Sequence, residues 1–411
     1  MDIFIAGVGM TEFGKLAELS VKDLTRIAVN EALADAGIGL DAIEAAYFAN
    51  TAQGYMEGQT FVRAQIALRD MGLSGIPMTS VENACASGSS AVNLAMQHIL
   101  AGQDDVVLAV GVEKLFNPDK ARMLSLFDGG WDVSRVEEST RDLFALSPDI
   151  TPPPGTMSER PYSVFMDVYA AFCRAHMQKF GTTQRQIAAV SAKNHQHSVE
   201  NPKAQYRHSM TIEEVLDAPP ISYPLTLPMC APISDGGAAT VICSEAGLKR
   251  LGIPRERCVR ILSSVVQTGV PRAPDDHANH VTVHAARKAY EKAGVGPSDV
   301  SVAEVHDATA MGELIQSENL GFFEFGESGP AAERGETTIG GSIPINPSGG
   351  LESKGHPIGA TGRGQIHELV TQLRGEAGPR QVENAKVALC ENGGGLYGVE
   401  EAVVGVTILA R

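Results

Sequence analysis

The sequence lacks the patterns of membrane-spanning, secreted and nucleic-acid-binding proteins. No stretch approaches the roughly 18 consecutive apolar residues that a transmembrane helix requires, and the first residues carry no basic segment of the kind that opens a signal peptide. Basic residues are few, because 33 lysines and arginines stand against 49 acidic residues. No basic stripe for a phosphate backbone is visible. We therefore expect a cytoplasmic protein that binds neither nucleic acid nor membrane.

Cysteine and aromatic residues are also scarce. The six cysteines lie far apart and include no Cys-x-x-Cys pair, so they predict neither a metal site nor a disulfide framework. Free cysteines fit a reducing compartment. Aromatic residues make up only 5% of the chain, and no apolar substrate tunnel is recognisable from the sequence. The cysteines are Cys85, Cys173, Cys230, Cys243, Cys258 and Cys390.

What the chain does contain is a long-period internal repeat. Strand-like apolar runs alternate with helical patterns, which predicts a parallel or mixed α/β sheet. Three segments of the first half match three segments of the second half in the same order. The matches are 28–39 with 285–296, 85–88 with 359–362, and 106–109 with 387–390. We therefore predict two similar α/β halves rather than a solenoid.

Residues 119–235 interrupt this repeat. They hold the only tryptophan, Trp131, a proline-rich run at 151–155 and many charges. We predict an inserted domain that covers the sheet. The expected division is an N-terminal half, an inserted loop domain and a C-terminal half, at 1–118 with 236–252, 119–235, and 253–411.

Cys85 lies between small residues, directly before a helical pattern that begins near Val92. A cysteine at the start of a helix faces unpaired backbone N–H groups and the positive end of the helix dipole. That position lowers a thiol pKa from about 8.5 into the range of roughly 3.5–7.5. We therefore predict that Cys85 is a nucleophile. The alternative is a buried cysteine that packs as a small apolar side chain.

Three further polar positions follow strands of the second half. His306 follows the strand-like residues 302–305, His356 lies in the loop 346–362, and Cys390 ends an apolar run before three glycines. Ligand sites of α/β sheets lie beyond the carboxyl ends of strands. A cysteine nucleophile needs a base and an oxyanion hole, and an imidazole such as that of His356 suits the base. The alternatives are a surface histidine, a core histidine and an inert packed cysteine.

These motifs resemble those of the thiolases, in order and in spacing. The matching segments are Asn83–Gly88, Ser353–Ala360 and Cys390–Gly395, and the likeness covers the whole chain. The His306-Asp307 pair resembles the sterol-carrier-protein-type thiolases and their bacterial and archaeal relatives. The resemblance implies a fold of duplicated α/β/α/β/α layered halves with an inserted loop domain.

The resemblance also implies the role of each residue. Cys85 is expected to be acylated, His356 to activate it, and Cys390 to move the proton to or from the α-carbon. His306 and His356 are expected to form one oxyanion hole. The backbone N–H groups of Cys85 and of a glycine in 393–395 are expected to form the other.

The chain departs from the family pattern at two places. Many thiolases have Cys-x-Gly-Gly-Gly, whereas here Glu391 and Asn392 precede the glycines, so Asn392, Gly393 and Gly394 are all candidates for the oxyanion hole. The segment 228–236 lacks the usual Asn-Ala-Ser-Gly, and Ser234 is the one residue there that we expect to contact coenzyme A.

The resulting hypothesis is a thiolase that cleaves or forms 3-oxoacyl-CoA, as in β-oxidation-like metabolism, through an acyl group on Cys85. Coenzyme A would be a substrate, with no permanently bound cofactor and no metal. The resemblance implies a homodimer or a dimer of dimers, with a small zinc-ribbon/OB-fold protein as a further subunit. The alternatives are a condensing acyltransferase that acts with such a partner on branched or aromatic 3-oxoacyl-CoA, and a non-catalytic acyl-CoA-binding scaffold.

Overall fold

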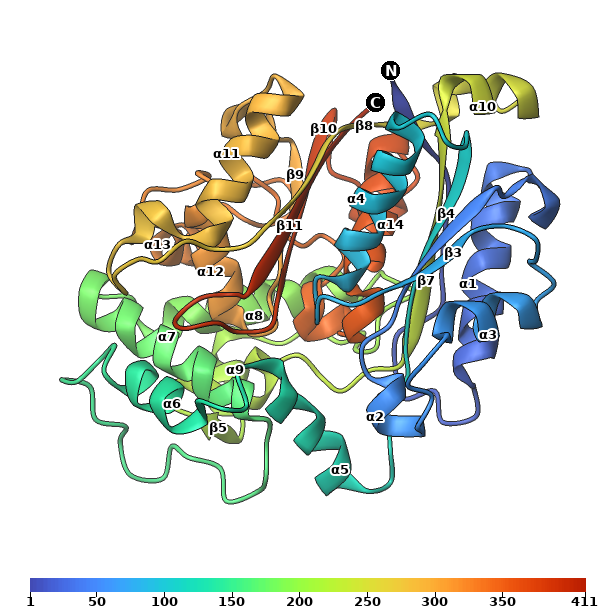
Figure 1. Cartoon of the computed structure of the whole chain (residues 1–411). Coiled ribbons are helices and arrows are strands. Elements are labelled where there is room, and N and C mark those ends of the chain that lie inside the picture. Colours follow the sequence, from blue (N-terminus) through green and yellow to red (C-terminus); the bar gives the residue numbers. More distant parts are fainter.

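A nine-stranded mixed sheet forms the centre of the computed structural model, which describes all 411 residues (Figure 1). The strand order is β3-β2-β4-β7-β1-β8-β11-β10-β9. The strands are β1 (Ile3–Met10), β2 (Ala45–Ala49), β3 (Met78–Val81), β4 (Val106–Glu113), β7 (Gly236–Ser244), β8 (Val259–Gln267), β9 (Val302–Glu304), β10 (Val387–Gly394) and β11 (Val403–Ala410). A separate two-stranded ribbon holds β5 (Pro220–Ser222) and β6 (Leu225–Thr226).

The sheet consists of two halves with the same strand order. In the first half β2 is parallel to β4, and β4, β7 and β1 follow as antiparallel neighbours. In the second half β9, β10, β11 and β8 repeat that pattern. The matching helices α1 (Val21–Ala36) and α11 (Val281–Ala293) both end at a left-handed glycine, Gly37 and Gly294. The predicted duplicated α/β fold is confirmed.

Two central helices join the halves. α4 (Ser87–Leu100) and α14 (Thr361–Arg374) contact each other between the two parts of the sheet (Figure 1). Both begin at the positions that the internal repeat aligns. A core of 24 buried residues joins side chains of both helices with strand residues of both halves, and each large apolar side chain in it stabilises the fold by roughly 1.5–3 kcal/mol. Gly88 permits this approach, because a Cβ there would lie only 3.0 Å from the Gly359 carbonyl oxygen.

The remaining helices lie around the sheet, with α5, α6, α7 and α9 at its lower end and α10 at its upper end in Figure 1. They are α2 (Gln53–Glu57), α3 (Arg63–Asp70), α5 (Lys120–Ser125), α6 (Val136–Phe144), α7 (Val164–Phe180), α8 (Gln184–Ser198), α9 (Ile212–Leu216), α10 (Glu245–Leu251), α12 (Ala310–Asn319) and α13 (Ser328–Glu333). In the sequence, helices α5 to α9 all come after β4 and before β7. In the fold, α8 contacts both α12 and the π-helical turn Gly350–Lys354. The insertion therefore packs against the loops that follow the second-half strands. None of the helices combines the length and apolar character needed to cross a bilayer.

Candidate active site

Cys85 lies in a tight turn between β3 and α4. The Ser87 hydroxyl donates to the Ala84 carbonyl at 2.6 Å and accepts from the Asn83 amide at 2.8 Å. Ala84 has a left-handed φ of 47°, a conformation that costs an ordinary residue energy. Such strain recurs where a turn must hold a reactive side chain. The turn directs Cys85 toward the loops of the second half.

The thiol meets two imidazoles there. Cys85 Sγ, one ring nitrogen of His306 and one ring nitrogen of His356 all lie within 4.8 Å of one another. The two rings are edge to face, with centroids 5.2 Å apart. Cys85 precedes α4, His306 lies between β9 and α12, and His356 precedes α14. Three segments far apart in the sequence thus converge at the carboxyl ends of strands and at the central helices.

His356 is held on two sides. Its Nδ1 forms a 2.7 Å hydrogen bond with the Thr361 hydroxyl, and its backbone N–H donates to Ser234 Oγ at 3.0 Å. The Thr361 hydroxyl can donate or accept in this bond; the base role assigned to His356 requires that Nδ1 donates, which leaves a free lone pair on Nε2. Burial lowers the pKa of His356 well below its usual value, and the nearby His306 lowers it further. His356 is therefore a neutral imidazole with an accepting nitrogen available.

Ser234 does not face a ligand. The residue is fully buried, and its hydroxyl donates to Gln205 Oε1 at 2.7 Å while accepting from the His356 amide. The expectation that Ser234 contacts coenzyme A is wrong, because no surface of the side chain is open to a substrate. Its structural effect is to anchor the His356 loop to the insertion.

His306 has the opposite hydrogen-bonding pattern. The Asn392 amide nitrogen donates to His306 Nδ1 at 3.1 Å, and the Ser89 hydroxyl donates to Asn392 Oδ1 at 3.0 Å. Because Nδ1 accepts, the ring proton must be on Nε2. Burial lowers the pKa of His306 to about 4, so the ring is neutral at physiological pH. His306 thus offers a donor where His356 offers an acceptor.

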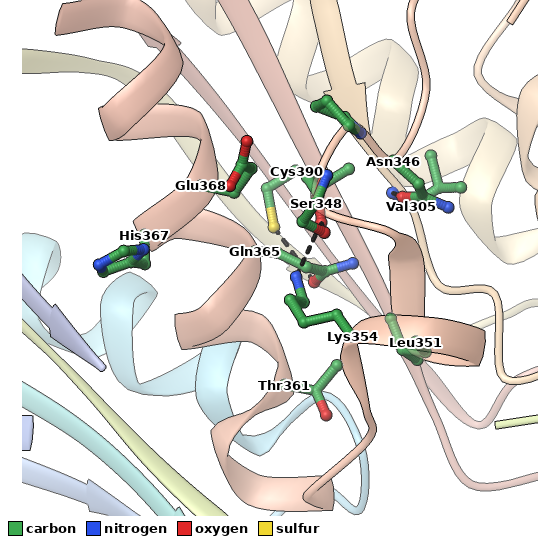
Figure 2. A network of polar contacts seen from close by, with 12 residues as sticks. Val305, Asn346, Ser348, Leu351, Lys354, Thr361, Gln365, His367, Glu368 and Cys390 are labelled. Carbon is green, nitrogen blue, oxygen red and sulfur yellow. Dashed lines mark hydrogen bonds and ion pairs between the residues drawn. The ribbon is translucent and has the colours of Figure 1, made fainter. Parts of the chain in front are cut away.

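Cys390 does not join this group. Its thiol donates to Gln365 Oε1 at 3.4 Å in the core between the halves, as Figure 2 shows. Burial raises the pKa of the Cys390 thiol to about 12. Side chains two residues apart on a strand share a face but lie about 6–7 Å apart along it. Asn392 is the β10 residue that contacts His306. Cys390 lies two residues earlier on the strand, in the core, so its thiol does not join Cys85 and the two histidines as predicted.

The three glycines after Asn392 have three different surroundings. A Cβ on Gly393 would collide with Glu401, and one on Gly394 would collide with the Asn83 carbonyl and Ala86. Gly395, which has a left-handed φ of 63°, directs its backbone N–H at the Cys85 thiol. The sequence leaves the donor open among the glycines 393–395, with Asn392, Gly393 and Gly394 as the named candidates, because the end of the strand at Gly394 cannot be located from the sequence.

The resting state of Cys85 also differs from expectation. Burial raises the pKa of the thiol to about 12, and the nearby Glu113 carboxyl adds to the rise, although the Gly395 N–H opposes it. The prediction that the helix start lowers this pKa is wrong, because desolvation and a neighbouring acid exceed the dipole effect. Cys85 rests as a neutral thiol, and it must lose its proton to a base during the reaction.

A buried polar network beneath the site was missed from the sequence. Asn194 of α8 donates to Asp307 at 3.0 Å and to Glu352 at 2.9 Å, and the Leu351 amide donates to Asp307 at 2.8 Å. Burial raises the pKa of Asp307 well above its usual value, with Glu352 adding to the effect. The network ties the loop after His306 to the loop before His356, so Asp307 is structural rather than solvated.

Comparisons with known proteins agree with this arrangement. Residues 3–215 match the family model "Thiolase, N-terminal domain", and residues 265–407 match "Thiolase C-terminal domain-like". The chain belongs to the thiolase family. Thiolases are acyltransferases that use coenzyme A as a substrate.

Several thiolase-family relatives match over nearly the whole chain. Acetyl-CoA acetyltransferase of Methanothermobacter thermautotrophicus is 37% identical over 97% of both proteins. Sterol carrier protein 2 of Bos taurus is 38% identical over 98% of this chain and 71% of its own length. The benzoylsuccinyl-CoA thiolase subunit BbsB of Thauera aromatica is 34% identical over 96% of this chain and 94% of its own. The predicted likeness to sterol-carrier-protein-type thiolases is confirmed.

Solved structures show the same fold. The Ltp2-ChsH2(DUF35) aldolase has a TM-score of 0.77 at 22% identity, and it covers 100% of this chain and 98% of that chain. Human mitochondrial 3-ketoacyl-CoA thiolase in complex with CoA has a TM-score of 0.70 at 17% identity, with the same coverage. At these identities the likeness concerns the fold alone.

Proposed function

We propose that the protein is a thiolase that cleaves or forms 3-oxoacyl-CoA through an acyl group carried on Cys85. The observation that supports this proposal most directly is the cluster of the Cys85 thiol with the neutral imidazoles of His306 and His356. We assign His356 as the proton acceptor and His306 as the proton donor. A nucleophile, a base and an oxyanion donor are the three groups that acyl transfer through a thioester requires. Membership of an acyltransferase family supports the proposal.

In the cleavage direction, the Cys85 thiol gives its proton to Nε2 of His356. The sulfur then attacks the 3-keto carbon of the substrate. The oxygen of that carbon becomes negatively charged, and we assign the backbone N–H groups of Cys85 and Gly395, which both act on the Cys85 sulfur, as its donors. A donor of this kind typically contributes about 10²–10³ in turnover.

The carbon–carbon bond then breaks, and the departing part leaves as the enolate of an acyl-CoA. The His306 Nε2–H is the donor for the enolate oxygen. The α-carbon regains one proton, which we assign to the His356 imidazolium, because the Cys390 thiol points into the core toward Gln365. The proton taken from Cys85 is thus returned, and no second thiol is needed for balance.

The thioester on Cys85 is then released by coenzyme A. His356 takes the proton of the coenzyme A thiol, whose sulfur attacks the acyl carbon, and the proton returns to Cys85 as its sulfur leaves. Met123, Leu126 and Phe127 of the insertion pack against the same small apolar cluster as Cys85 does. We place the pantetheine arm under this cover, with residues 119–235 as the wall of the coenzyme A site.

We further propose that the enzyme works in the cytoplasm as a homodimer or a dimer of dimers, together with a small subunit. Two names support the small subunit: BbsB is named as a subunit, and the similar solved aldolase is named with a DUF35 protein. Purification of the chain with and without its co-purifying proteins, followed by measurement of molecular mass, tests this assembly.

The test of the activity is a thiolysis assay. Wild-type enzyme, alone and with any co-purifying small protein, is incubated with coenzyme A and a set of 3-oxoacyl-CoAs. We expect chain-shortened acyl-CoA from the wild type and none from Cys85→Ser. Equal product from Cys85→Ser and wild type would contradict the proposal.

A further inference from the structure

The cluster of Cys85, His306 and His356 has a second chemical capacity besides acyl transfer. Each side chain offers one ligand atom, a sulfur or a ring nitrogen, and the three atoms lie within 4.8 Å of one another. A zinc ion at about 2.3 Å from a sulfur and about 2.0–2.1 Å from two nitrogens places those atoms roughly 3.3–3.6 Å apart. Inward movements of about 1 Å or less per atom would therefore close this triangle onto an ion.

The chain has no second group of this kind. Among all its His, Cys, Asp and Glu side chains, this is the one set of three or more whose ligand atoms lie so close together. The buried carboxyls around Asn194 differ, because Asn194 and Lys193 already donate hydrogen bonds to them. Thiolate and imidazole bind zinc well, whereas magnesium and calcium prefer oxygen ligands. The ligand set therefore selects a zinc-like ion.

The cluster is open to solvent on the side of the thiol. Five of the six cysteines are buried, and Cys85 is the one that keeps partial exposure. His356 keeps 8% and His306 only 3% of its surface exposed. The thiol is thus the outermost ligand, and the two imidazoles lie deeper. Three protein ligands leave the fourth position of a tetrahedral zinc ion to water.

Both imidazoles have a hydrogen-bonding partner at Nδ1. Nδ1 of His356 lies 2.7 Å from the Thr361 hydroxyl, and Nδ1 of His306 lies 3.1 Å from the Asn392 amide nitrogen. A histidine that binds a metal through one nitrogen usually donates the N–H of the other to an oxygen, which orients the ring and raises its basicity. The Thr361 hydroxyl already offers such an oxygen to His356.

His306 needs one rearrangement before it binds an ion. In acyl transfer its ring proton is on Nε2, because the Asn392 nitrogen donates to Nδ1. A half-turn of the Asn392 amide brings Oδ1 to that position, and the Ser89 hydroxyl, which now donates to Oδ1, can then accept from the amide nitrogen. The ring proton is then on Nδ1 and the lone pair on Nε2. The orientation of one amide therefore distinguishes the catalytic cluster from the metal-binding one.

We propose that Cys85, His306 and His356 bind a zinc ion, with water as the fourth ligand, and that this ion inhibits the enzyme reversibly. The Cys85 S–H bond is exchanged for a Zn–S bond, the proton leaves to the solvent, and each imidazole binds through a lone pair. No oxidation state changes. The nucleophile, the base and the oxyanion donor are then all occupied, so zinc and substrate exclude each other. The inhibition rests on the proposed thiolase function, whereas the binding does not.

Titration calorimetry with zinc chloride tests the binding without turnover. We expect one zinc ion per chain in the wild type and in Cys390→Ala, which removes a core thiol outside the cluster. Cys85→Ser should weaken zinc binding by more than about 100-fold, since loss of an outer partner alone costs about 10–100-fold. Equal binding by Cys85→Ser and wild type, or an equal loss in Cys85→Ser and Cys390→Ala, overturns the proposal.

Thiol labelling locates the ion. Because the other five cysteines are buried, N-ethylmaleimide should label Cys85 first, and the labelled peptide is identified by mass spectrometry. We expect zinc to block this labelling, magnesium to leave it unchanged and EDTA to restore it. Undiminished labelling of Cys85 in the zinc-saturated protein overturns the proposal.

The Asn392→Asp variant separates zinc binding from catalysis. The aspartate accepts from Nδ1–H of His306 and keeps the lone pair on Nε2, which is the form that binds an ion. We expect zinc to bind about tenfold more tightly to this variant, because a carboxylate partner raises the basicity of a metal-binding histidine, although its kcat falls. Unchanged or weaker zinc binding removes His306 from the ligand set and overturns the proposal. Absence of thiolysis by the zinc-free wild type would instead count against the proposed function.

Discussion

The Asn392 amide nitrogen lies 3.1 Å from Nδ1 of His306, and this contact determines which nitrogen of the ring carries the proton. The Ser89 hydroxyl orients the amide by donating to Asn392 Oδ1. The proton is therefore on Nε2, as an oxyanion donor requires. On the other ring, Nδ1 of His356 is hydrogen-bonded to the Thr361 hydroxyl, and Nε2 is free to accept a proton when Nδ1 is the donor of that bond. Two hydrogen bonds divide the roles of acid and base between two neutral imidazoles.

The first prediction concerns this tautomer. Asn392→Asp keeps the size of the side chain, but an aspartate accepts from Nδ1–H and places the lone pair on Nε2. We expect the kcat of thiolysis to fall by about 10²–10³, the usual loss when an oxyanion donor is removed. Steady-state kinetics on Asn392→Asp and on the matched Ser89→Ala variant, which only loosens the amide, measure the effect. Wild-type kcat in Asn392→Asp would show that His306 is not the donor.

The second prediction separates the two cysteines. Cys390→Ala removes a thiol that contacts Gln365 in the core. We expect turnover within a few-fold of wild type and a loss of stability of about 1 kcal/mol from one hydrogen bond and a small cavity. Cys85→Ala should abolish turnover with little change in the melting temperature. A hundredfold loss of kcat in Cys390→Ala would restore the role that the sequence resemblance implied for this residue.

The third prediction concerns Ser234. Ser234→Ala leaves the His356 backbone N–H buried without a partner, which costs about 1–3 kcal/mol and loosens the loop that carries the base. We expect kcat to fall about tenfold while the KM for coenzyme A stays unchanged. A rise in that KM at constant kcat would instead mean that Ser234 contacts coenzyme A.

The fourth prediction concerns pH. The pKa of His306 is lowered to about 4 by burial, and that of His356 is lowered well below its usual value. We therefore expect the rate of Cys85 acylation to stay level from pH 8 down to about pH 5, where an unshifted histidine would already be protonated. Stopped-flow acylation over this range provides the profile, and circular dichroism confirms that the fold persists. A rate that falls with an apparent pKa near 6.5 contradicts the assignment.

The same shifts affect stability. A histidine whose pKa is lower in the folded state than in the unfolded state stabilises the fold fully above the unfolded pKa, near 6.5. That contribution is lost as the pH falls from about 6.5 toward the folded value of about 4 for His306. We expect His306→Gln, which removes this titration, to lose less stability than wild type over that pH range in urea melts.

Most of the fold and the central part of the site could be predicted from the sequence, because both depend on local patterns. The repeat fixes the two halves, and the segments around Cys85 and His356 are short motifs whose turns form from their own residues. The position of Cys390 depends instead on where along β10 the site begins. Cys390 and Asn392 are two residues apart on the same face of the strand, yet the Cys390 thiol contacts Gln365 in the core and Asn392 contacts His306 in the site. No local signal distinguishes those two positions.

Other features required the tertiary structure. The Ser234 hydroxyl donates to Gln205 and accepts from the His356 amide, and the sequence around Ser234 indicates neither hydrogen bond. The pKa of Cys85 depends on how deeply the turn is buried and on Glu113, which approaches from the end of β4. Helix position alone therefore gave the wrong direction for this thiol.

The most direct test of the central claim is the mass of the acylated protein. Wild-type enzyme is incubated with acetyl-CoA, quenched in acid and analysed intact and after digestion. We predict a gain of one acetyl group, located on the peptide that holds Cys85, and no gain in Cys85→Ser. An adduct on any other residue, or an unchanged adduct in Cys85→Ser, would contradict it.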